Sequence, residues 1–183
     1  NSQWLKHDVV RQYGVAADKI QVTPEAPPTQ WASAPSAADP ARVKARYGLQ
    51  EGFAFYPAVA WPHKNHLRLI DAIAGLRDRG IDARLVCSGG PDKAHWPAIE
   101  RRLAERALGD RIQFLGMVPQ EDLPALYRLA GCLILPTLFE ANSLPIFEAW
   151  REGTPVVSSN VTALPEQAGE AALLFDPFDV EAM

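Results

Sequence analysis

Two glutamates with seven residues between them, Glu140 and Glu148, have the types and the spacing that most directly indicate a functional site. The apolar residues 132–136 before them are typical of a buried strand. The residues from Ser143 onward are typical of a helix start, because serine suits an N-cap and Pro145 in the first turn loses no helical hydrogen bond. One carboxylate is therefore expected at the carboxyl end of a strand, and the other about one turn into the following helix.

The backbone between the two carboxylates adds a second kind of chemistry. The first N–H groups of a helix have no partner inside it, and a phosphate binds well there. Carboxylates that accept hydrogen bonds from hydroxyls, on either side of a phosphate site, predict a pocket for a sugar joined to a nucleoside diphosphate. A glycosidase could also use two carboxylates, as acid and nucleophile, but the phosphate-type helix start would then have no purpose. A third alternative makes Glu140 a helix cap and Glu148 a surface residue.

A lysine on another predicted turn could neutralise such a phosphate. Residues 53–59 are typical of a strand, and Lys64 lies in the turn after it, just ahead of a helix. Its ammonium could contact phosphate oxygens beside the positive end of that helix, or it could be a solvated surface charge. His63 and His66 have no acidic or cysteine partner at a suitable spacing in the sequence, so we expect ordinary polar contacts for both.

Two glycine-containing turns follow other predicted strands. Gly89 and Gly90 allow the backbone to approach a ligand closely. The turn with Gly116 and Val118 could present backbone N–H and C=O groups to the edge of a base, although turn formation alone explains these residues equally well. The dinucleotide fingerprint is absent, because no glycine follows at its third position, and this makes an NAD enzyme a weak alternative.

Apolar strands alternate along the chain with amphipathic helices. This alternation predicts an α/β fold, Rossmann-like, with a parallel sheet and helices on both faces. Ligands bind such sheets beyond the carboxyl ends of the strands, where the turns described above lie. The predicted strands are residues 53–59, 83–88, 111–115, 132–136, 155–158 and 171–175, and the predicted helices are residues 66–78, 94–107, 120–129 and from 145 onward.

The first forty residues have a different character. Residues 4–13 are typical of a short amphipathic helix, and residues 19–23 are typical of a strand. Proline, small and polar residues then run from Pro24 to Pro40, which predicts an interdomain linker. Because the sequence does not begin with methionine and stops inside an apparent helix start, we expect an excised piece of a longer protein.

Composition and charge argue against several classes of protein. The 183 residues are 48% hydrophobic and 22% charged, as in an ordinary globular protein. The net charge of −4 gives no support for binding to nucleic acid or to an anionic membrane surface. No apolar stretch of the sequence is long enough to span a bilayer, and no signal peptide is visible. Cys87 and Cys132 are expected to be small buried hydrophobes in a reducing compartment, so we expect a cytoplasmic protein.

Taken in order, these motifs resemble the donor-binding, C-terminal domain of retaining glycosyltransferases of family 4 (glycosyl transferases group 1), which have the two-domain GT-B architecture. The similarity runs from about Arg46 to Phe175. It implies that residues 1–30 are the tail of an N-terminal, acceptor-side domain and the start of the linker. Residues 31–183 would be the donor-binding domain, truncated at its C-terminus. The motifs are Lys64-Asn65, Gly89-Gly90, residues 114–118, residues 139–149 and residues 153–157.

The resemblance also implies a role for each matching residue. Glu140 and Lys64 would be catalytic, with Glu140 on the hydroxyls of the transferred sugar and Lys64 on the leaving phosphate. Glu148 would bind the ribose hydroxyls. The family needs no metal ion, and the sequence has no Asp-x-Asp motif to hold one, so the expected ligand is a UDP- or GDP-linked sugar without a cofactor. Further donor contacts would come from Asn142, Ser143, Leu144, Gly90, Gly116, Val118 and His63.

The sequence departs from the family pattern in two places. Ala60-Trp61 stands where the family often has Gly-Arg, which removes a second cationic contact. The segment from Glu140 to Pro145 lacks the two glycines of the family's Glu-Gly-Phe-Gly-Leu-Pro, which narrows the freedom of the backbone and could alter the sugar that is accepted.

The function implied by the resemblance is transfer of a hexose from a nucleotide sugar to a hydroxyl acceptor. The form of residues 61–66 resembles members that act in bacterial surface-polysaccharide assembly, often with mannose donors. The acceptor, a glycan or a lipid-linked sugar, would bind mainly to the missing domain, which could also associate with the membrane surface. The isolated piece would then be inactive. The alternatives are a non-catalytic module that binds sugar nucleotides, and an epimerase or phosphorylase of related architecture.

Overall fold

The computed structural model describes residues 1–23, 25 and 39–183 and contains a sheet of six parallel strands. Their spatial order is β3-β2-β1-β4-β5-β6, so the chain builds outward from β1 to one edge and then from β4 to the other. This order confirms the predicted Rossmann-like α/β fold. The strands are β1 (Ala54–Pro57), β2 (Leu85–Ser88), β3 (Ile112–Phe114), β4 (Cys132–Leu135), β5 (Val156–Ser159) and β6 (Leu173–Phe175).

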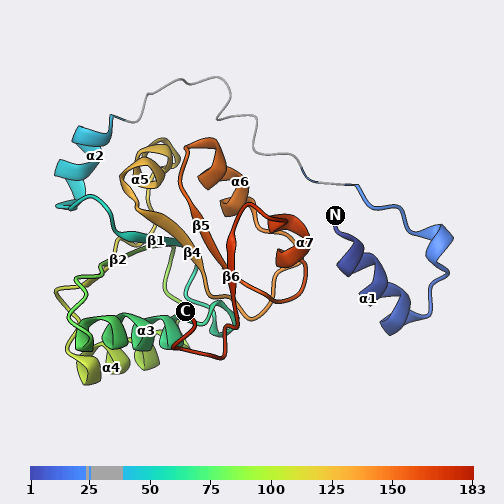
Figure 1. Cartoon of the computed structure of the whole chain (residues 1–183), viewed down its shortest axis with the longest axis horizontal. Helices are drawn as coiled ribbons and strands as arrows, with labels where there is room; N and C mark the ends of the chain where they lie inside the picture. The colour runs from blue at the N-terminus through green and yellow to red at the C-terminus, as the bar shows by residue number, and fades with distance from the viewer. Residues whose placement is uncertain (24, 26–38) are drawn as a thin grey trace.

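Helices cover both faces of the sheet (Figure 1). Helices α3 (His66–Asp78) and α4 (Trp96–Arg106) pack together on one side, and α5 (Leu123–Leu129) and α6 (Leu144–Arg151) lie on the other. The short helix α7 (Leu164–Ala168) packs against β5. Right-handed crossovers explain this division, because the direction of travel across the sheet reverses between β3 and β4.

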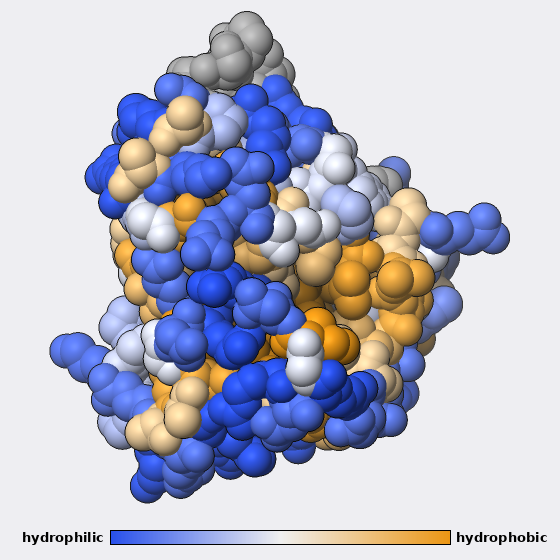
Figure 2. All heavy atoms as spheres, turned by 60° about the vertical axis from the view of Figure 1, so that its left-hand side comes forward, coloured by the Kyte–Doolittle hydropathy of each residue, from blue (hydrophilic) through white to orange (hydrophobic). Residues whose placement is uncertain are grey.

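The central strands are apolar on both faces because helices cover both. Phe55 of β1 is completely buried and lies in register between Val86 of β2 and Leu133 of β4. Burying each such side chain contributes about 1.5–3 kcal/mol relative to leaving it exposed. The side of the molecule that carries α2 (Pro40–Tyr47) is mostly hydrophilic at its surface, with apolar residues gathered in a recess (Figure 2).

A buried carboxylate fixes helix α2 to the rest of the fold. The side chain of Asp122, at the end of a 3-10 turn before α5, has no exposed surface. It accepts hydrogen bonds from the guanidinium groups of Arg42 and Arg46 and from the hydroxyl of Tyr47, the last two at 3.0 and 2.8 Å. Buried charges are tolerated only when they are paired in this way, so this cluster holds α2 against α5.

The predictions for the N-terminal segment have mixed outcomes. The helix expected at residues 4–13 is confirmed as α1 (Gln3–Tyr13), but the strand expected at residues 19–23 is wrong. Residues 17–19 form a 3-10 turn, and residues 20–23 pair with no strand in the described part of the chain. The predicted domain boundary at residues 30 and 31, like most of the predicted linker, lies outside the described residues. Among the helices that the structure describes, none is both long and apolar enough to cross a membrane.

Candidate functional site

A pocket of about 290 Å³ lies at the carboxyl edge of the sheet, between the loops that follow β1 and β4. The connections from these two strands run to opposite faces of the sheet, and open α/β sheets bind ligands at such a switch point. A smaller hollow of about 130 Å³ lies at the amino ends of β2 and β3 and contains none of the predicted site residues. The lining of the larger pocket includes Lys64, Glu140, Asn142, Ser143 and Leu144.

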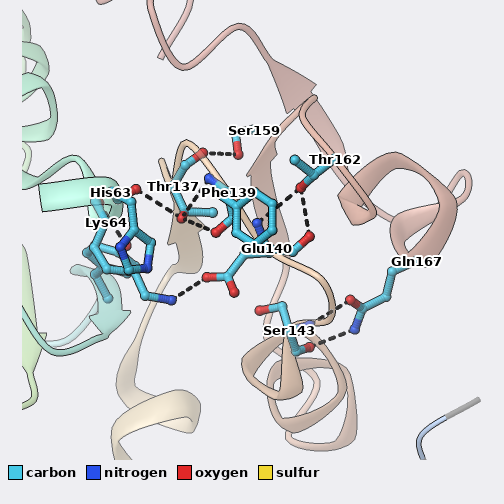
Figure 3. A network of polar contacts seen from close by, with 10 residues as sticks. His63, Lys64, Thr137, Phe139, Glu140, Ser143, Ser159, Thr162 and Gln167 are labelled. Atoms are coloured by element: carbon cyan, nitrogen blue, oxygen red, sulfur yellow. Dashed lines mark hydrogen bonds and ion pairs between the residues drawn. The ribbon is translucent and has the colours of Figure 1, made fainter. Parts of the chain in front are cut away.

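Lys64 and Glu140 form an ion pair across this pocket (Figure 3). Lys64 comes from the turn after β1 and Glu140 from the β4–α6 loop, residues 136–143. Their side chains are only 16% and 15% exposed, so the attraction is screened less than that of a surface pair. The sequence placed both residues at the site but did not predict that they would pair. An anion that enters the pocket must therefore compete with Glu140 for the ammonium group.

The turn that carries Lys64 is fixed by Asn65. This residue is buried and adopts a left-handed backbone conformation with φ 61°, which asparagine tolerates better than most residues. Its Nδ2 atom donates to the carbonyl oxygens of Pro136 and Pro177, each at 2.9 Å. In addition, the hydroxyl of Tyr56 donates to the carbonyl of Lys64 at 2.8 Å. The two loops of the pocket are thus tied together through the end of β4.

The backbone of the β4–α6 loop corrects one expectation. Ser143 occupies the N-cap position of α6, but its side chain makes no capping hydrogen bond. Its N–H donates to Oε1 of Gln167 at 2.9 Å, and its carbonyl accepts from Nε2 at 2.6 Å. The N–H of Ser143 is therefore occupied and does not point to an anion. The N–H groups of Asn142 and Leu144 have no partner among the described residues and stay candidates for binding a phosphate.

Glu148 lies on α6 outside the pocket lining and bonds to a buried tyrosine. Its Oε2 atom accepts from the hydroxyl of Tyr127 at 2.7 Å. Burial raises the pKa of the Glu148 carboxyl above its usual value, while the hydrogen bond from Tyr127 acts to lower it. A carboxylate has lone pairs for several donors, so Glu148 can still accept hydrogen bonds from ligand hydroxyls.

Replacing Tyr127 by phenylalanine should raise the pKa of Glu148 further. The buried ring would keep its packing, but the hydroxyl that stabilises the ionised carboxylate would be lost. NMR titration of the carboxyl carbon of Glu148 in the two proteins would measure the change. An equal or lower pKa in Tyr127→Phe would show that this hydrogen bond does not hold the carboxylate ionised.

The glycine turns after β2 and β3 lie beside the pocket rather than in it. Gly89 has φ 125°, and a Cβ atom there would lie 2.4 Å from the carbonyl oxygen of Ala58, so backbone packing alone already requires glycine at this position. Gly89 donates to the carbonyl of Gly116 at 2.8 Å, and Ala60 donates to that of Gly90 at 3.0 Å. Gly90 has more room, since its nearest neighbour there is the sulfur of a methionine at 3.8 Å. Gly90, Gly116 and Val118 are not part of the pocket lining.

The two histidines near Lys64 have different surroundings. The ring of His63 stacks on the ring of Trp61 with 5.7 Å between centroids, and His63 is not part of the pocket lining. Burial, and to a smaller extent the charge of Lys64, lowers the pKa of His63. His66 does not make the ordinary polar contacts that were expected. It is buried between the rings of Tyr56 and Phe114, and neither ring nitrogen has a partner among the described residues. Burial lowers the pKa of His66 to about 4, so this ring is neutral at pH 7.

Metal binding has no visible ligand set in the part of the chain that the structure describes. No group of three or more histidine, cysteine, aspartate or glutamate side chains there is placed to hold an ion. The expectation that a donor binds without a metal ion stays a prediction.

Known proteins are similar to this chain in both sequence and fold. A chain from Escherichia coli, O-antigen chain mannosyltransferase B, is 36% identical over 187 residues, which cover 100% of this chain and 48% of that protein. The 2-deoxystreptamine glucosyltransferase of Streptomyces kanamyceticus is 33% identical, over 87% of this chain and 41% of that protein. The chain thus spans about half the length of these curated relatives, or less.

Solved structures agree with the fold described above. The structure of Anabaena Alr3699/HepE in complex with UDP and glucose has a TM-score of 0.84 at 20% identity, over 100% of this chain and 50% of that one. The profile of the family described as glycosyl transferases group 1 matches residues 51–183, which include every residue placed at the pocket. The chain therefore belongs to the glycosyl transferases group 1 family, and its sheet is a Rossmann-like half of the GT-B fold.

Proposed function

We propose that this chain is the donor-binding part of a retaining glycosyltransferase that moves a hexose from a nucleoside diphosphate sugar to a hydroxyl acceptor. The observation that carries the proposal is the pocket at the β1/β4 switch point, which combines a cation, a carboxylate and the start of a helix. Lys64 and the N–H groups at the start of α6 suit the negative diphosphate. Glu140 suits the hydroxyls of the sugar.

The pocket supports catalysis through the leaving group. Transfer requires charge to build up on the departing diphosphate, and a fixed ammonium with helix N–H groups stabilises such charge most in a site that excludes water. In this proposal the diphosphate takes Lys64 from its ion pair, and the released Glu140 accepts hydrogen bonds from the sugar. Glu148 binds the ribose hydroxyls, with the base lying towards Gly90, Gly116 and Val118. No metal ion is needed for these contacts.

The relatives support a more specific version of the proposal. Two matching Escherichia coli proteins are named as mannosyltransferases, one of them for the O-antigen chain, so mannose linked to GDP is the first donor to test. The Anabaena structure contains UDP and glucose, so UDP-linked hexoses are the second. The acceptor would be a glycan or lipid-linked sugar, held mainly by a further domain that could contact the membrane surface. The reaction would take place in the cytoplasm, in the assembly of bacterial surface polysaccharide.

Binding of a nucleoside diphosphate should raise the thermal midpoint of this chain. At about ten times its dissociation constant, GDP or UDP should stabilise the fold by about 1.4 kcal/mol. For a protein of this size that energy raises the midpoint by roughly 3–5 °C. Differential scanning fluorimetry with GDP, UDP and NAD would measure the shifts.

The controls distinguish this proposal from its alternatives. NAD should leave the midpoint unchanged, and EDTA should not alter the shift produced by GDP or UDP. Stabilisation by NAD alone would contradict the proposal. A shift that disappears with EDTA and returns with magnesium would show that a metal ion holds the phosphate.

A further inference from the structure

One short segment of the chain, residues 162–167, runs from the end of the β5–α7 connection into α7 and holds the β4–α6 loop at two points (Figure 3). The hydroxyl of Thr162 accepts from the N–H of Glu140 at 3.0 Å and donates to the carbonyl of Glu140 at 2.7 Å. The amide of Gln167 bonds in the same two-sided way to the N–H and carbonyl of Ser143. Each side chain thus brackets one residue of the loop from both sides, so the loop cannot rotate about these residues without losing hydrogen bonds.

The backbone of this segment is strained at the residue that makes the first bracket. Thr162 has φ 53°, a left-handed conformation that a β-branched residue rarely adopts. Such a conformation costs about 1–3 kcal/mol and persists only where the surroundings determine it. The N–H of Ala163 also donates to the carbonyl of Glu140, at 3.3 Å. The strained backbone therefore turns both Thr162 and Ala163 towards Glu140.

The same segment also contacts helix α1. The carboxylate of Glu166 accepts from the N–H groups of Gln3 and Trp4 at 2.8 and 2.9 Å, at the positive end of α1. The ring of Trp4 packs edge-to-face on Phe139 with 5.9 Å between centroids. Helix α1 therefore rests on both α7 and the β4–α6 loop, although it is far from them in sequence.

We propose that Thr162 and Gln167 are positioning residues for the donor pocket and that Glu166 ties their position to α1. Thr162 would set the direction of the Glu140 side chain, and so the contact with the transferred sugar. Gln167 would set the N–H groups of Asn142 and Leu144, and so the contact with the diphosphate. These ligand assignments rest on the proposed function, whereas the rigidity of the loop does not.

Binding measurements separate the two positioning roles. Thr162→Val keeps the shape but removes the hydroxyl, so it should weaken GDP-mannose and UDP-glucose by about tenfold and leave GDP and UDP within about twofold. Thr162→Ser keeps the hydroxyl, so its affinity for the sugar-bearing donors should stay close to that of the unchanged chain. Gln167→Met should weaken all four ligands by about tenfold. Gln113→Met is the matched control, because the amide of Gln113 also bonds to a backbone carbonyl but far from the pocket, and it should change none of them.

The link to α1 needs a second measurement. Glu166→Gln removes the charge at the start of α1, so hydrogen exchange at the N–H groups of Gln3 and Trp4 should speed up at least tenfold, and sugar-bearing donors should bind about threefold more weakly. Glu181→Gln, which removes an exposed ion pair with Arg79, should do neither. Faster exchange with unchanged affinity, or no change in either, would overturn the link between α1 and the pocket.

Hydrogen exchange of the loop separates this inference from the proposed function. If the unchanged chain binds none of the four nucleotides, the proposed function is wrong. The positioning inference is then decided at the bracket that each substitution leaves intact, which is the N–H of Ser143 in Thr162→Val and the N–H of Glu140 in Gln167→Met. Faster exchange there in both Thr162→Val and Gln167→Met, and not in Gln113→Met, supports positioning. Unchanged exchange overturns it. In the binding measurements, it is also overturned if Thr162→Ser loses as much affinity as Thr162→Val and the loss is the same for all four ligands.

Discussion

Asp122→Asn should lower the free energy of unfolding by about 3 kcal/mol, the low end of the usual cost of breaking a buried ion pair from one side, because the two arginines are nearly half exposed and keep part of their hydration. The substitution would leave the guanidinium groups of Arg42 and Arg46 facing a neutral amide, and the Tyr47 hydroxyl with a weaker acceptor. In a protein of this size the thermal midpoint should fall by roughly 10 °C. Helix α2 should be released first, because three of its side chains bond to Asp122.

The dependence of stability on pH provides an independent check. Burial alone would raise the pKa of the Asp122 carboxyl, but hydrogen bonds from Tyr47 and Arg42 and the charges of Arg42 and Arg46 hold it below its usual value. The unfolded chain therefore binds a proton at a higher pH, about 3.9, than the folded chain. The stabilisation is complete above that pH and is lost as the pH falls towards the folded pKa. The Asp122→Asn variant should lack this part of the loss of stability at low pH.

Urea denaturation at several pH values would measure both effects. Asp78→Asn is the control, because its carboxylate is 63% exposed and pairs only with the neighbouring Arg77 in the described part of the chain. Its effect should stay within about 0.5 kcal/mol. Equal losses in the two variants would mean that the buried cluster does not hold α2 in place.

Glu148→Gln should weaken the bare diphosphate and the full nucleotide sugar alike, because the ribose is common to both. Loss of the charge costs roughly 1.5–3 kcal/mol if Glu148 bonds to the ribose hydroxyls, which is about 10- to 150-fold in affinity. Calorimetry with GDP and GDP-mannose would measure it. Glu51→Gln, in an exposed pair with Lys44, is the control and should bind both ligands normally.

Glu140→Gln should change the affinities for the same two ligands differently. The sugar-bearing donor should bind about tenfold more weakly, because the charge that strengthens the bonds to the sugar hydroxyls is lost. Bare GDP should bind at least as well as before, because Lys64 would be released from its ion pair. If Glu140→Gln weakens GDP as much as Glu148→Gln does, the assignment of the two carboxylates to sugar and ribose is wrong.

The sequence was a good guide where local pattern and topology decide the outcome. Apolar runs bounded by turns identified the six strands, and the rule that ligands bind beyond strand ends placed Lys64 and Glu140 at one edge. The roles of Thr162 and Gln167 could not be predicted. Their partners are backbone atoms 22 and 24 residues away, and threonine and glutamine carry no pattern that marks such contacts. The position of Asn65 could be recognised only weakly from the sequence, as an asparagine directly before a predicted helix.

The wrong predictions have a physical cause as well. Residues 19–23 have the composition of a strand, but a strand exists only where a neighbour supplies hydrogen bonds, and the described residues supply none. Helix α2 was not predicted because its Asp39 N-cap and Pro40 look like the end of a linker. Ser143 took the N-cap position, but Gln167 bonded to the backbone that a ligand was expected to use.

The contact between Gly89 and Ala58 divides the pocket region into parts with different tolerance to redesign. Any side chain at residue 89 would collide with backbone on the neighbouring strand end, so residue 89 itself cannot be varied to change selectivity. The opposite side includes the side chains of Asn142 and Leu144, on a loop that hydrogen bonds from Gln167 hold in shape. A library meant to change the accepted sugar should vary that loop and keep residue 89 as glycine.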